Sequence, residues 1–258
     1  MAYTIAVAGK GGVGKTTLAG LIIRLLAERD DGPVLAVDAD ANANLNVVLG
    51  MDLEKTIGDL REELLDNIRD LSPGMTKDTY LELGLEECLV EGSGVDLLAM
   101  GHGEGQRCYC AVNHVLRRYM DKLSGAYRYV VMDNEAGLEH VSRTTTQDVD
   151  LLLVVAIDTP VALQSAARIH DLVGQLDLNV AKLGLVVNNV NGTDPERLRA
   201  HVDRTGLELL GVVPRDEGVL ELSWAGESVM ALPEDAPALE IVRELMETLL
   251  PVRTATTR

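Results

Sequence analysis

Short runs of consecutive apolar residues alternate along most of the chain with segments in which apolar residues recur every three or four positions. Continuous apolar runs of this length are typical of strands in a parallel sheet that is covered on both faces. We expect such strands at residues 3–8, 34–37, 95–100, 127–132, 151–157, 182–187 and 208–213.

The segments with helical periodicity lie between these runs. Asp194 is expected to cap one of them, with Pro195 at its first helical position. Because strands and helices alternate, the pattern predicts an α/β fold with a single doubly wound, mostly parallel sheet and helices on both faces. The expected helices cover residues 17–29, 161–176, 195–205 and 238–250.

Residues 51–94 interrupt this alternation. The stretch is acidic and contains a Ser72-Pro73-Gly74 turn signal, with expected helices at 57–70 and near 81–90. We therefore expect one domain over residues 1–258, with residues 51–94 as a helical insertion rather than a second domain.

Charge and composition limit the classes of partner that the chain can bind. The chain has 23 Lys and Arg against 41 Asp and Glu, a formal net charge of −18. Such a charge repels phosphate backbones and acidic lipid surfaces. Aromatic residues make up 3%, with no Phe, so no platform for stacking single-stranded bases is visible. We expect neither nucleic acid nor membrane as a partner.

The three cysteines, Cys88, Cys108 and Cys110, are too few for a disulfide scaffold. Residues 1–5 show no basic stretch ahead of a long apolar run, and the longest apolar run, 151–157, is too short to cross a bilayer. These features favour a cytoplasmic location.

A phosphate-binding motif follows the first expected strand and precedes the first expected helix. Residues 9–16 fit G-x-x-x-x-G-K-[ST], in which glycines let backbone N–H groups surround phosphate oxygens at a helix N-terminus. Lys15 would bind the β- and γ-phosphates of ATP, and the Thr16 hydroxyl would bind Mg²⁺. The alternative is a flexible glycine loop that matches by chance. The expected nucleotide contacts are Gly9, Lys10, Gly11, Gly12, Val13, Gly14, Lys15, Thr16 and Thr17.

Acidic residues follow two of the expected strands. Asp38 and Asp40 come after residues 34–37, and Asp133 comes after residues 127–132. Ligands of open α/β sheets bind at these carboxyl ends, where carboxylates can hold the water shell of Mg²⁺. Turn or capping roles for these acids are the alternative.

The stretch from Lys10 to Thr16, Lys-Gly-Gly-Val-Gly-Lys-Thr, resembles the deviant P-loop of the MinD/nitrogenase-iron-protein class of ATPases. The resemblance implies that Lys10 reaches the partner's nucleotide across an ATP-dependent dimer, although a lysine merely exposed near an anion is the alternative. It assigns Asp38 and Asp133 to the Mg²⁺ water shell and Asp40 to the attacking water. With Lys10 and Lys15, Asp40 makes the implied catalytic set, and Gly137 is the implied γ-phosphate sensor of a second switch.

The same resemblance implies which residues bind the adenine base of ATP. Asn188, after the run 182–187, would bind the adenine edge, and Pro214 and Arg215 would flank the ring. An ordinary Asn188-Asn189 turn is the alternative.

Cys108 and Cys110 stand two positions apart, just ahead of an amphipathic segment at residues 112–123. Two thiolates supply half of a tetrahedral shell for Zn²⁺ or a similar ion, and a two-fold axis between subunits would supply the other half. Alternatively, His102 or His114 completes a site within one subunit, or the cysteines are buried small hydrophobes. Cys88 is expected in the core.

Taken together, these motifs resemble the CooC-type nickel-insertion accessory ATPases of carbon monoxide dehydrogenase. The carrying residues are the phosphate loop, the Asp38-Ala-Asp-Ala-Asn-Ala-Asn-Leu45 stretch, Cys108-Tyr-Cys110 and the Asp133–His140 stretch, Asp-Asn-Glu-Ala-Gly-Leu-Glu-His. The resemblance implies an ATP-dependent homodimer that binds Ni²⁺ or Zn²⁺ at the cysteine pair. Its implied client is nickel carbon monoxide dehydrogenase.

Two alternative functions remain open. An ATP-dependent iron–sulfur reductase would need two well-separated cysteines in each subunit. A partition or positioning ATPase would need a basic DNA-binding face or a basic amphipathic tail. The expected helix 238–250 instead carries Glu240, Glu244 and Glu247 on its polar side, which favours a helix docked on the core.

Overall fold

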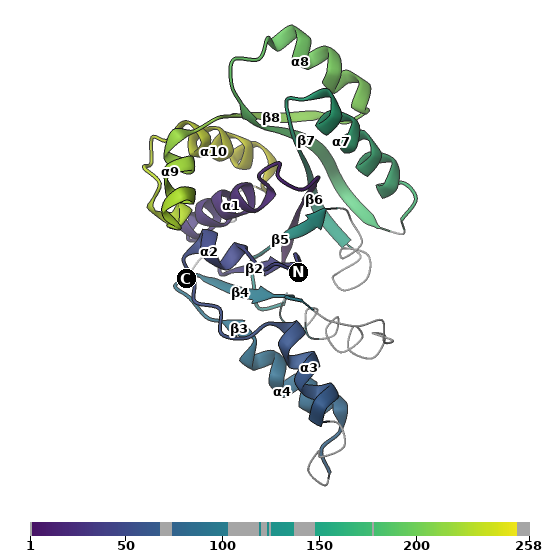
Figure 1. Ribbon diagram of the computed structural model, residues 1–258, viewed down its shortest axis with the longest axis vertical. Coiled ribbons are helices and arrows are strands. Elements are labelled where there is room, and N and C mark those ends of the chain that lie inside the picture. Colours follow the sequence, from purple (N-terminus) through teal and green to yellow (C-terminus); the bar gives the residue numbers. More distant parts are fainter. Residues whose placement is uncertain are drawn as a thin grey trace.

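The computed structural model describes residues 2–67, 74–102, 119, 123, 125–136, 148–176 and 178–251. These residues form an eight-stranded sheet with the order β3-β4-β2-β5-β1-β6-β7-β8, flanked by helices (Figure 1). Among the described strands, β3 pairs with β4 in the antiparallel direction. All other neighbouring strands in this order are parallel. The predicted α/β class with a mostly parallel sheet is confirmed.

All seven expected strands are present. β5, β6 and β7 extend further than their apolar runs, so Asp133 lies within β5 and not after it. The short strand β3 was not expected. The strands are β1 (Tyr3–Gly9), β2 (Val34–Asp38), β3 (Leu89–Val90), β4 (Val95–Ala99), β5 (Tyr129–Ala136), β6 (Asp148–Ile157), β7 (Asn179–Val190) and β8 (Leu209–Pro214).

The helices expected at 17–29, 161–176, 195–205 and 238–250 are present, with ends shifted by up to three residues. Asp194 caps α8 by accepting a hydrogen bond from the Glu196 amide at 3.2 Å, and Pro195 takes the first helical position, as expected. Two helices, α2 and α9, were not expected. The described helices are α1 (Lys15–Arg29), α2 (Leu45–Leu49), α3 (Ile57–Asn67), α4 (Lys77–Glu87), α7 (Pro160–Val173), α8 (Pro195–Val202), α9 (Glu217–Ala225) and α10 (Pro237–Leu249), with 3-10 turns η1 (Asp203–Thr205) and η2 (Val229–Ala231).

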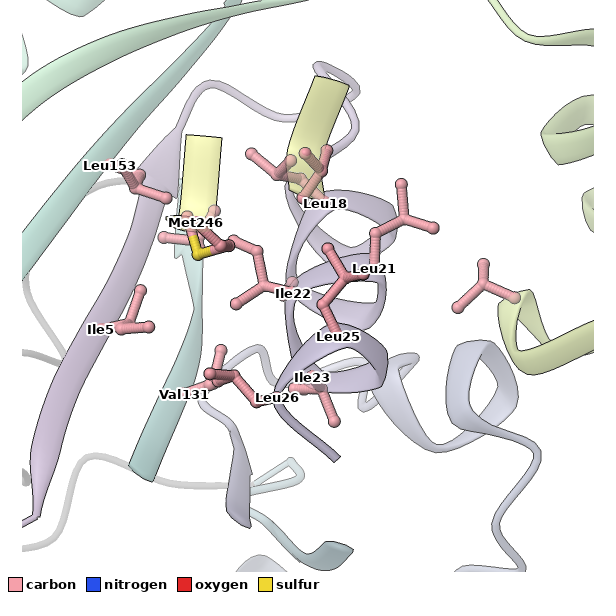
Figure 2. Close-up of a cluster of buried hydrophobic side chains, with 14 of the residues drawn as sticks. Ile5, Leu18, Leu21, Ile22, Ile23, Leu25, Leu26, Val131, Leu153 and Met246 are labelled. Atoms are coloured by element: carbon pink, nitrogen blue, oxygen red, sulfur yellow. The ribbon is translucent and has the colours of Figure 1, made fainter. Parts of the chain in front are cut away.

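The sheet separates two hydrophobic cores, since alternate residues of each strand point to opposite faces. On one face, Ile22 of α1 packs among side chains from the central strands and α10, including Ile5 and Met246 (Figure 2). On the other face, α7 contributes Leu163 and Ile169 to a cluster with the remaining strand side chains. Burial on both faces explains why the strands read as continuous apolar runs.

Helices α3 and α4 lie side by side and extend away from the sheet beyond β3 and β4 (Figure 1). Gly84 permits this packing, because a Cβ there would overlap the Leu60 side chain. The helix expected near 81–90 is displaced. It begins after the cap Thr76, whose hydroxyl accepts from the Thr79 amide at 3.1 Å, and ends at Glu87, so that residues 89–90 pair with β4.

Cys88 follows directly after α4 and is buried in the core, as expected. Its thiol donates to the Thr56 carbonyl at 3.3 Å, and burial raises the pKa of this thiol to about 12. Among the described helices, none is long and apolar enough to span a membrane. The amphipathic segment 112–123 lies outside the described residues, apart from Tyr119 and Leu123.

Candidate nucleotide site

The glycine loop connects β1 to α1 in a conformation that requires its glycines. Gly12 and Gly14 have φ angles of 79° and 86°, in the left-handed region that favours glycine. A Cβ at Gly9 would overlap the Val155 carbonyl oxygen. Gly14 precedes α1 as its N-cap, so the amides of the first turn receive no bond from an N-cap side chain. Free amides at a helix N-terminus bind anions.

Lys15 is the first residue of α1 and is only 8% exposed. Its ammonium nitrogen Nζ donates to the Lys10 carbonyl at 3.4 Å, which places the charge over the loop. The side chain of Lys10, by contrast, is exposed. Thr16 follows Lys15, and its hydroxyl is hydrogen-bonded to the Asp133 carboxylate. The loop therefore presents one buried and one exposed lysine.

Sheet register brings Asp38 and Asp133 together. They are paired residues on the adjacent strands β2 and β5, and they are 0% and 1% exposed. Both Asp38 oxygens accept backbone hydrogen bonds, Oδ1 from the Asp40 amide at 3.0 Å and Oδ2 from the Leu45 amide at 2.8 Å. The Asp38 carboxylate therefore fixes the loop that carries Asp40 and the start of α2.

The carboxylate of Asp133 has fewer hydrogen-bond partners among the described residues than that of Asp38. Among the described residues, its Oδ1 is buried and has no hydrogen-bond partner. Burial raises the pKa of Asp133 to about 7, against the lowering effect of the Thr16 hydrogen bond. Burial also raises the pKa of Asp38. An unpartnered carboxylate oxygen beside a second carboxylate and a hydroxyl fits the hard oxygen chemistry that Mg²⁺ requires.

Asp40 lies on the partly exposed loop between β2 and α2. Its Oδ1 accepts from the backbone and side-chain nitrogens of Asn42, at 2.9 and 3.0 Å. The neighbouring Ala41 carbonyl lies 3.3 Å from Nδ1 of His102, just beyond the end of β4. The loop that carries Asp40 is thus in contact, through Ala41, with His102 in the segment that follows β4.

A pocket of about 140 Å³ opens on the other side of the phosphate loop. Asn188 and Pro214, for which base contacts are predicted, line it, and so does Thr17; the base contacts themselves stay predictions. The Arg215 side chain instead is exposed and pairs with Glu217 at 3.0 Å. The walls are mostly apolar, formed by Val13, Leu18, Leu21, Ile157, Val213, Val219, Leu220 and Ala238, with polar groups at Asn188, Asn189 and Asp216.

Sequence reasoning missed Asp216 and the helix that follows it. Asp216 is buried and accepts from the amides of Gly218 at 2.9 Å, Val219 at 3.3 Å and Ala238 at 3.0 Å. It therefore caps α9 and anchors the start of α10; an Asp after a strand end was the available signal. Helix α9 has no buried residue, and its Trp224 is 89% exposed.

Gly137, Cys108, Cys110 and His114 lie outside the described residues, so their assignments remain predictions. Within the part of the chain that the structure describes, no group of three or more His, Cys, Asp or Glu side chains is arranged to hold a metal ion.

The fold and the loop define the class of protein. Residues 4–229 match the family model described as the CobQ/CobB/MinD/ParA nucleotide binding domain, so the chain belongs to this family. It is a P-loop ATPase.

Individual relatives cover nearly the whole chain. An uncharacterized ATP-binding protein of Methanocaldococcus jannaschii is 41% identical over 248 residues, which is 95% of this chain and 98% of the relative. The carbon monoxide dehydrogenase accessory protein CooC of Rhodospirillum rubrum is 32% identical over 237 residues, 87% of this chain and 88% of CooC. The MinD cell division protein of Aquifex aeolicus shares the fold, with a TM-score of 0.70 at 24% identity over 98% of this chain and all of that one.

Proposed function

We propose that this ATPase works as a homodimer that carries a metal ion at Cys108 and Cys110 and assists nickel insertion into carbon monoxide dehydrogenase. The observation that supports the hydrolytic part is the register of Asp38 and Asp133 beside the phosphate loop, with one buried Asp133 oxygen left without a partner among the described residues.

In the proposed hydrolytic site, the loop amides and Lys15 hold the β- and γ-phosphates. Bound Mg²⁺ would neutralise charge on the phosphates, with Thr16 as a direct ligand and Asp38 and Asp133 accepting from its water shell. Asp40 orients the attacking water, and Gly137 senses the γ-phosphate. Asp40 suits this role because its loop is partly open to solvent while Asp38 holds the loop in place.

Dimerisation is supported by the exposure of Lys10. Its side chain extends from the outer surface of the loop, whereas Lys15 is buried against it. An exposed lysine there can reach the phosphates bound by a second copy. Two copies would also supply four thiolates, a complete tetrahedral shell for Ni²⁺ or Zn²⁺ as cargo.

The metal-carrying part rests on the similarity to CooC and on a connection within the chain. The Met100 amide donates to the Asp38 carbonyl at 2.8 Å, and His102 contacts the Ala41 carbonyl. Cys108 follows His102 by only six positions. The segment that leads to the cysteine pair is thus bonded at its start to the loop of Asp38 and Asp40. A shift of that loop on ATP hydrolysis would therefore move a segment that lies only six residues before Cys108 in the chain.

The first test separates hydrolysis from metal binding. Lys15→Ala should lower the rate of ATP hydrolysis by on the order of 1,000-fold, because it removes a phosphate contact made in the transition state. Its stoichiometry of bound Ni²⁺ without nucleotide should stay as in the wild type. Steady-state turnover and metal analysis measure the two properties. Retained turnover would overturn the assignment of the hydrolytic site.

The second test addresses the cysteine pair. Cys108→Ala and Cys110→Ala should each abolish Ni²⁺ binding by the dimer, while ATP binding persists. Cys88→Ala is the matched control, because Cys88 is buried in the core and should not affect the metal stoichiometry. Equal metal content in all three variants would refute the thiolate site.

A second candidate is a positioning ATPase, favoured by the fold similarity to MinD. Such a role needs a basic surface or a free amphipathic helix. Here α10 packs its apolar face into the core, with Leu239 and Val242 fully buried. Sedimentation with anionic vesicles or with DNA in the presence of ATP would support the second candidate. An iron–sulfur reductase, in turn, would purify as a brown, redox-active dimer.

A further inference from the structure

Near the carboxyl ends of two strands of the central sheet, two residues stand opposite a single residue of the neighbouring strand. In both cases the first of the two residues is asparagine. On β5, Asn134 and Glu135 stand opposite a single residue of β1, between the pairs Val7–Asp133 and Gly9–Ala136. Such β-bulges bend the strand and redirect a side chain, and they are frequent next to active sites.

The second bulge lies on β7, on the other side of the phosphate loop. Asn188 and Asn189 stand opposite a single residue of β8, between the pairs Val187–Val212 and Val190–Pro214. Asn189 has a φ of 57°, in the left-handed region, which asparagine tolerates better than most residues.

Both redirected side chains bind the backbone of the segment that forms the phosphate loop. The amide nitrogen Nδ2 of Asn134 donates to the Val7 carbonyl at 3.0 Å. Nδ2 of Asn188 donates to the Val13 carbonyl at 2.9 Å. Val7 precedes the loop on β1, and Val13 lies within it. The two amides therefore hold both flanks of the loop.

The packing around these amides is close and specific. A Cβ on Gly14 would overlap Nδ2 of Asn188, so the loop and this amide fit only with glycine there. Asn134 is 1% exposed, and among the described residues its Oδ1 has no hydrogen-bond partner. An unsatisfied buried acceptor costs free energy. The bonds of this side chain are therefore made by Nδ2, to the Val7 carbonyl at 3.0 Å and to the Met132 carbonyl at 3.4 Å.

We propose that Asn134 and Asn188 are positioning residues that hold the phosphate loop in its anion-binding shape before nucleotide binds. A glycine-rich chain loses much conformational freedom when it is ordered, and a loop that is already ordered pays less of this cost on binding. The inference rests on the proposed phosphate site. It gives Asn188 a role toward the phosphates that is independent of any contact with the base.

Inorganic pyrophosphate distinguishes this role from base recognition, because it has no base. Calorimetry with Mg²⁺ should compare ADP and pyrophosphate as ligands. Asn188→Ala should weaken the binding of both by the same factor, about threefold to tenfold, as expected for one lost hydrogen bond. Asn134→Ala should act in the same way. Weaker binding of ADP with unchanged binding of pyrophosphate would overturn the proposal for Asn188.

Two further variants sharpen the test. Asn188→Asp keeps the size of the side chain but places an acceptor against the Val13 carbonyl, so it should weaken both ligands more than Asn188→Ala does. Asn179→Ala is the matched control, because Asn179 lies at the other end of β7, where its amide donates to the exposed Asp148 side chain at 2.9 Å. Its affinities for ADP and pyrophosphate should equal those of the wild type.

Because Asn134 is buried, thermal unfolding should first establish that Asn134→Ala folds. If it does not fold, the positioning role is tested with the variants of the half-buried Asn188 alone. Unchanged pyrophosphate affinity in the folded variants overturns the positioning role alone. A wild-type protein that binds neither ligand would overturn the nucleotide site as well, so the two failures are distinguishable.

Discussion

The phosphate loop separates two regions of unlike chemistry. On the side of β2 and β5, two buried carboxylates face each other in sheet register, and the nearby backbone is tightly hydrogen-bonded. On the side of β7 and β8, the pocket has mostly apolar walls and is bordered by α9, which has no buried residue. The first region consists of charged side chains buried in the sheet, and the second of an apolar pocket bordered by a partly exposed helix.

This contrast predicts different consequences for substitutions. Changes near the carboxylates should alter both the rate and the stability, because the charges are buried and coupled to the backbone. Changes in the apolar pocket should alter affinity and leave the rate nearly intact.

The largest effect is expected at Asp133. Asp133→Asn should lower kcat for ATP hydrolysis by about 100-fold or more, because it removes a charge directed at the phosphate and metal region. It should also raise the melting temperature of the nucleotide-free protein, since a buried carboxylate with an unpartnered oxygen becomes a neutral amide. Turnover and thermal unfolding measure the two effects. Asp171→Asn, on the exposed part of α7, should change neither.

Asp38→Asn should differ from Asp133→Asn in the sign of its effect on stability. Both Asp38 oxygens accept backbone amides, and an asparagine keeps only one acceptor oxygen. We expect a loss of about 1–3 kcal/mol in the free energy of unfolding, together with slower hydrolysis. If the two variants shifted the melting temperature in the same direction, the contrast between the two carboxylates would be wrong.

The pH dependence of stability offers a further test of Asp133. Its pKa is raised from 3.8 to about 7 by burial, so the folded state binds the proton more tightly than the unfolded state does. The contribution of Asp133 to the stability of the nucleotide-free protein, measured as wild type minus Asp133→Asn, should therefore be fully present below the unfolded-state pKa of 3.8 and should be lost as the pH rises to about 7. Thermal unfolding across this range measures the trend, and Asp133→Asn should flatten it. A wild-type profile as flat as that of the variant would contradict the raised pKa.

A smaller effect is expected in the apolar pocket. Val219→Ser should raise the KM for ATP by about fivefold, corresponding to about 1 kcal/mol of lost apolar contact, with kcat nearly unchanged. Val161→Ser is the control, because Val161 is exposed on α7 and does not line the pocket. A fall in kcat at constant KM would show that the two regions are not separate.

The smallest effect is expected on the pair of helices α3 and α4, away from both regions. Leu83→Glu replaces an exposed apolar residue of α4 and should change the free energy of unfolding by no more than about 0.5 kcal/mol. Hydrolysis should be unaffected. Slower turnover in this variant would connect these helices to the nucleotide site.

The parts of the fold that follow from local pattern could be predicted from the sequence. Strands such as β1 and β2 are buried on both faces, so their apolar runs were visible, and the glycine spacing located the phosphate loop. Helix α2 was missed because it is only five residues long and its start depends on the Asp38 carboxylate. Helix α9 was missed because the structure buries none of its residues, which leaves no regular apolar stripe.

The detailed site depends on contacts that no local pattern contains. The pairing of Asp38 with Asp133 is a property of strand order, which places β2 beside β5 although about ninety residues separate them in sequence. The two asparagine bulges depend on register shifts between neighbouring strands. Asn188 was predicted from resemblance to contact adenine, whereas its bond to the Val13 carbonyl became visible only in three dimensions.

The position of Trp224 has a practical consequence. It is the sole tryptophan of the chain, and it stands almost fully in solvent on the short helix whose first turn borders the pocket. The indole is therefore a built-in optical probe. A change in the surroundings of α9, on ligand entry or on association of two copies, can be followed by its emission and by quenching with iodide, in native protein and without an attached dye.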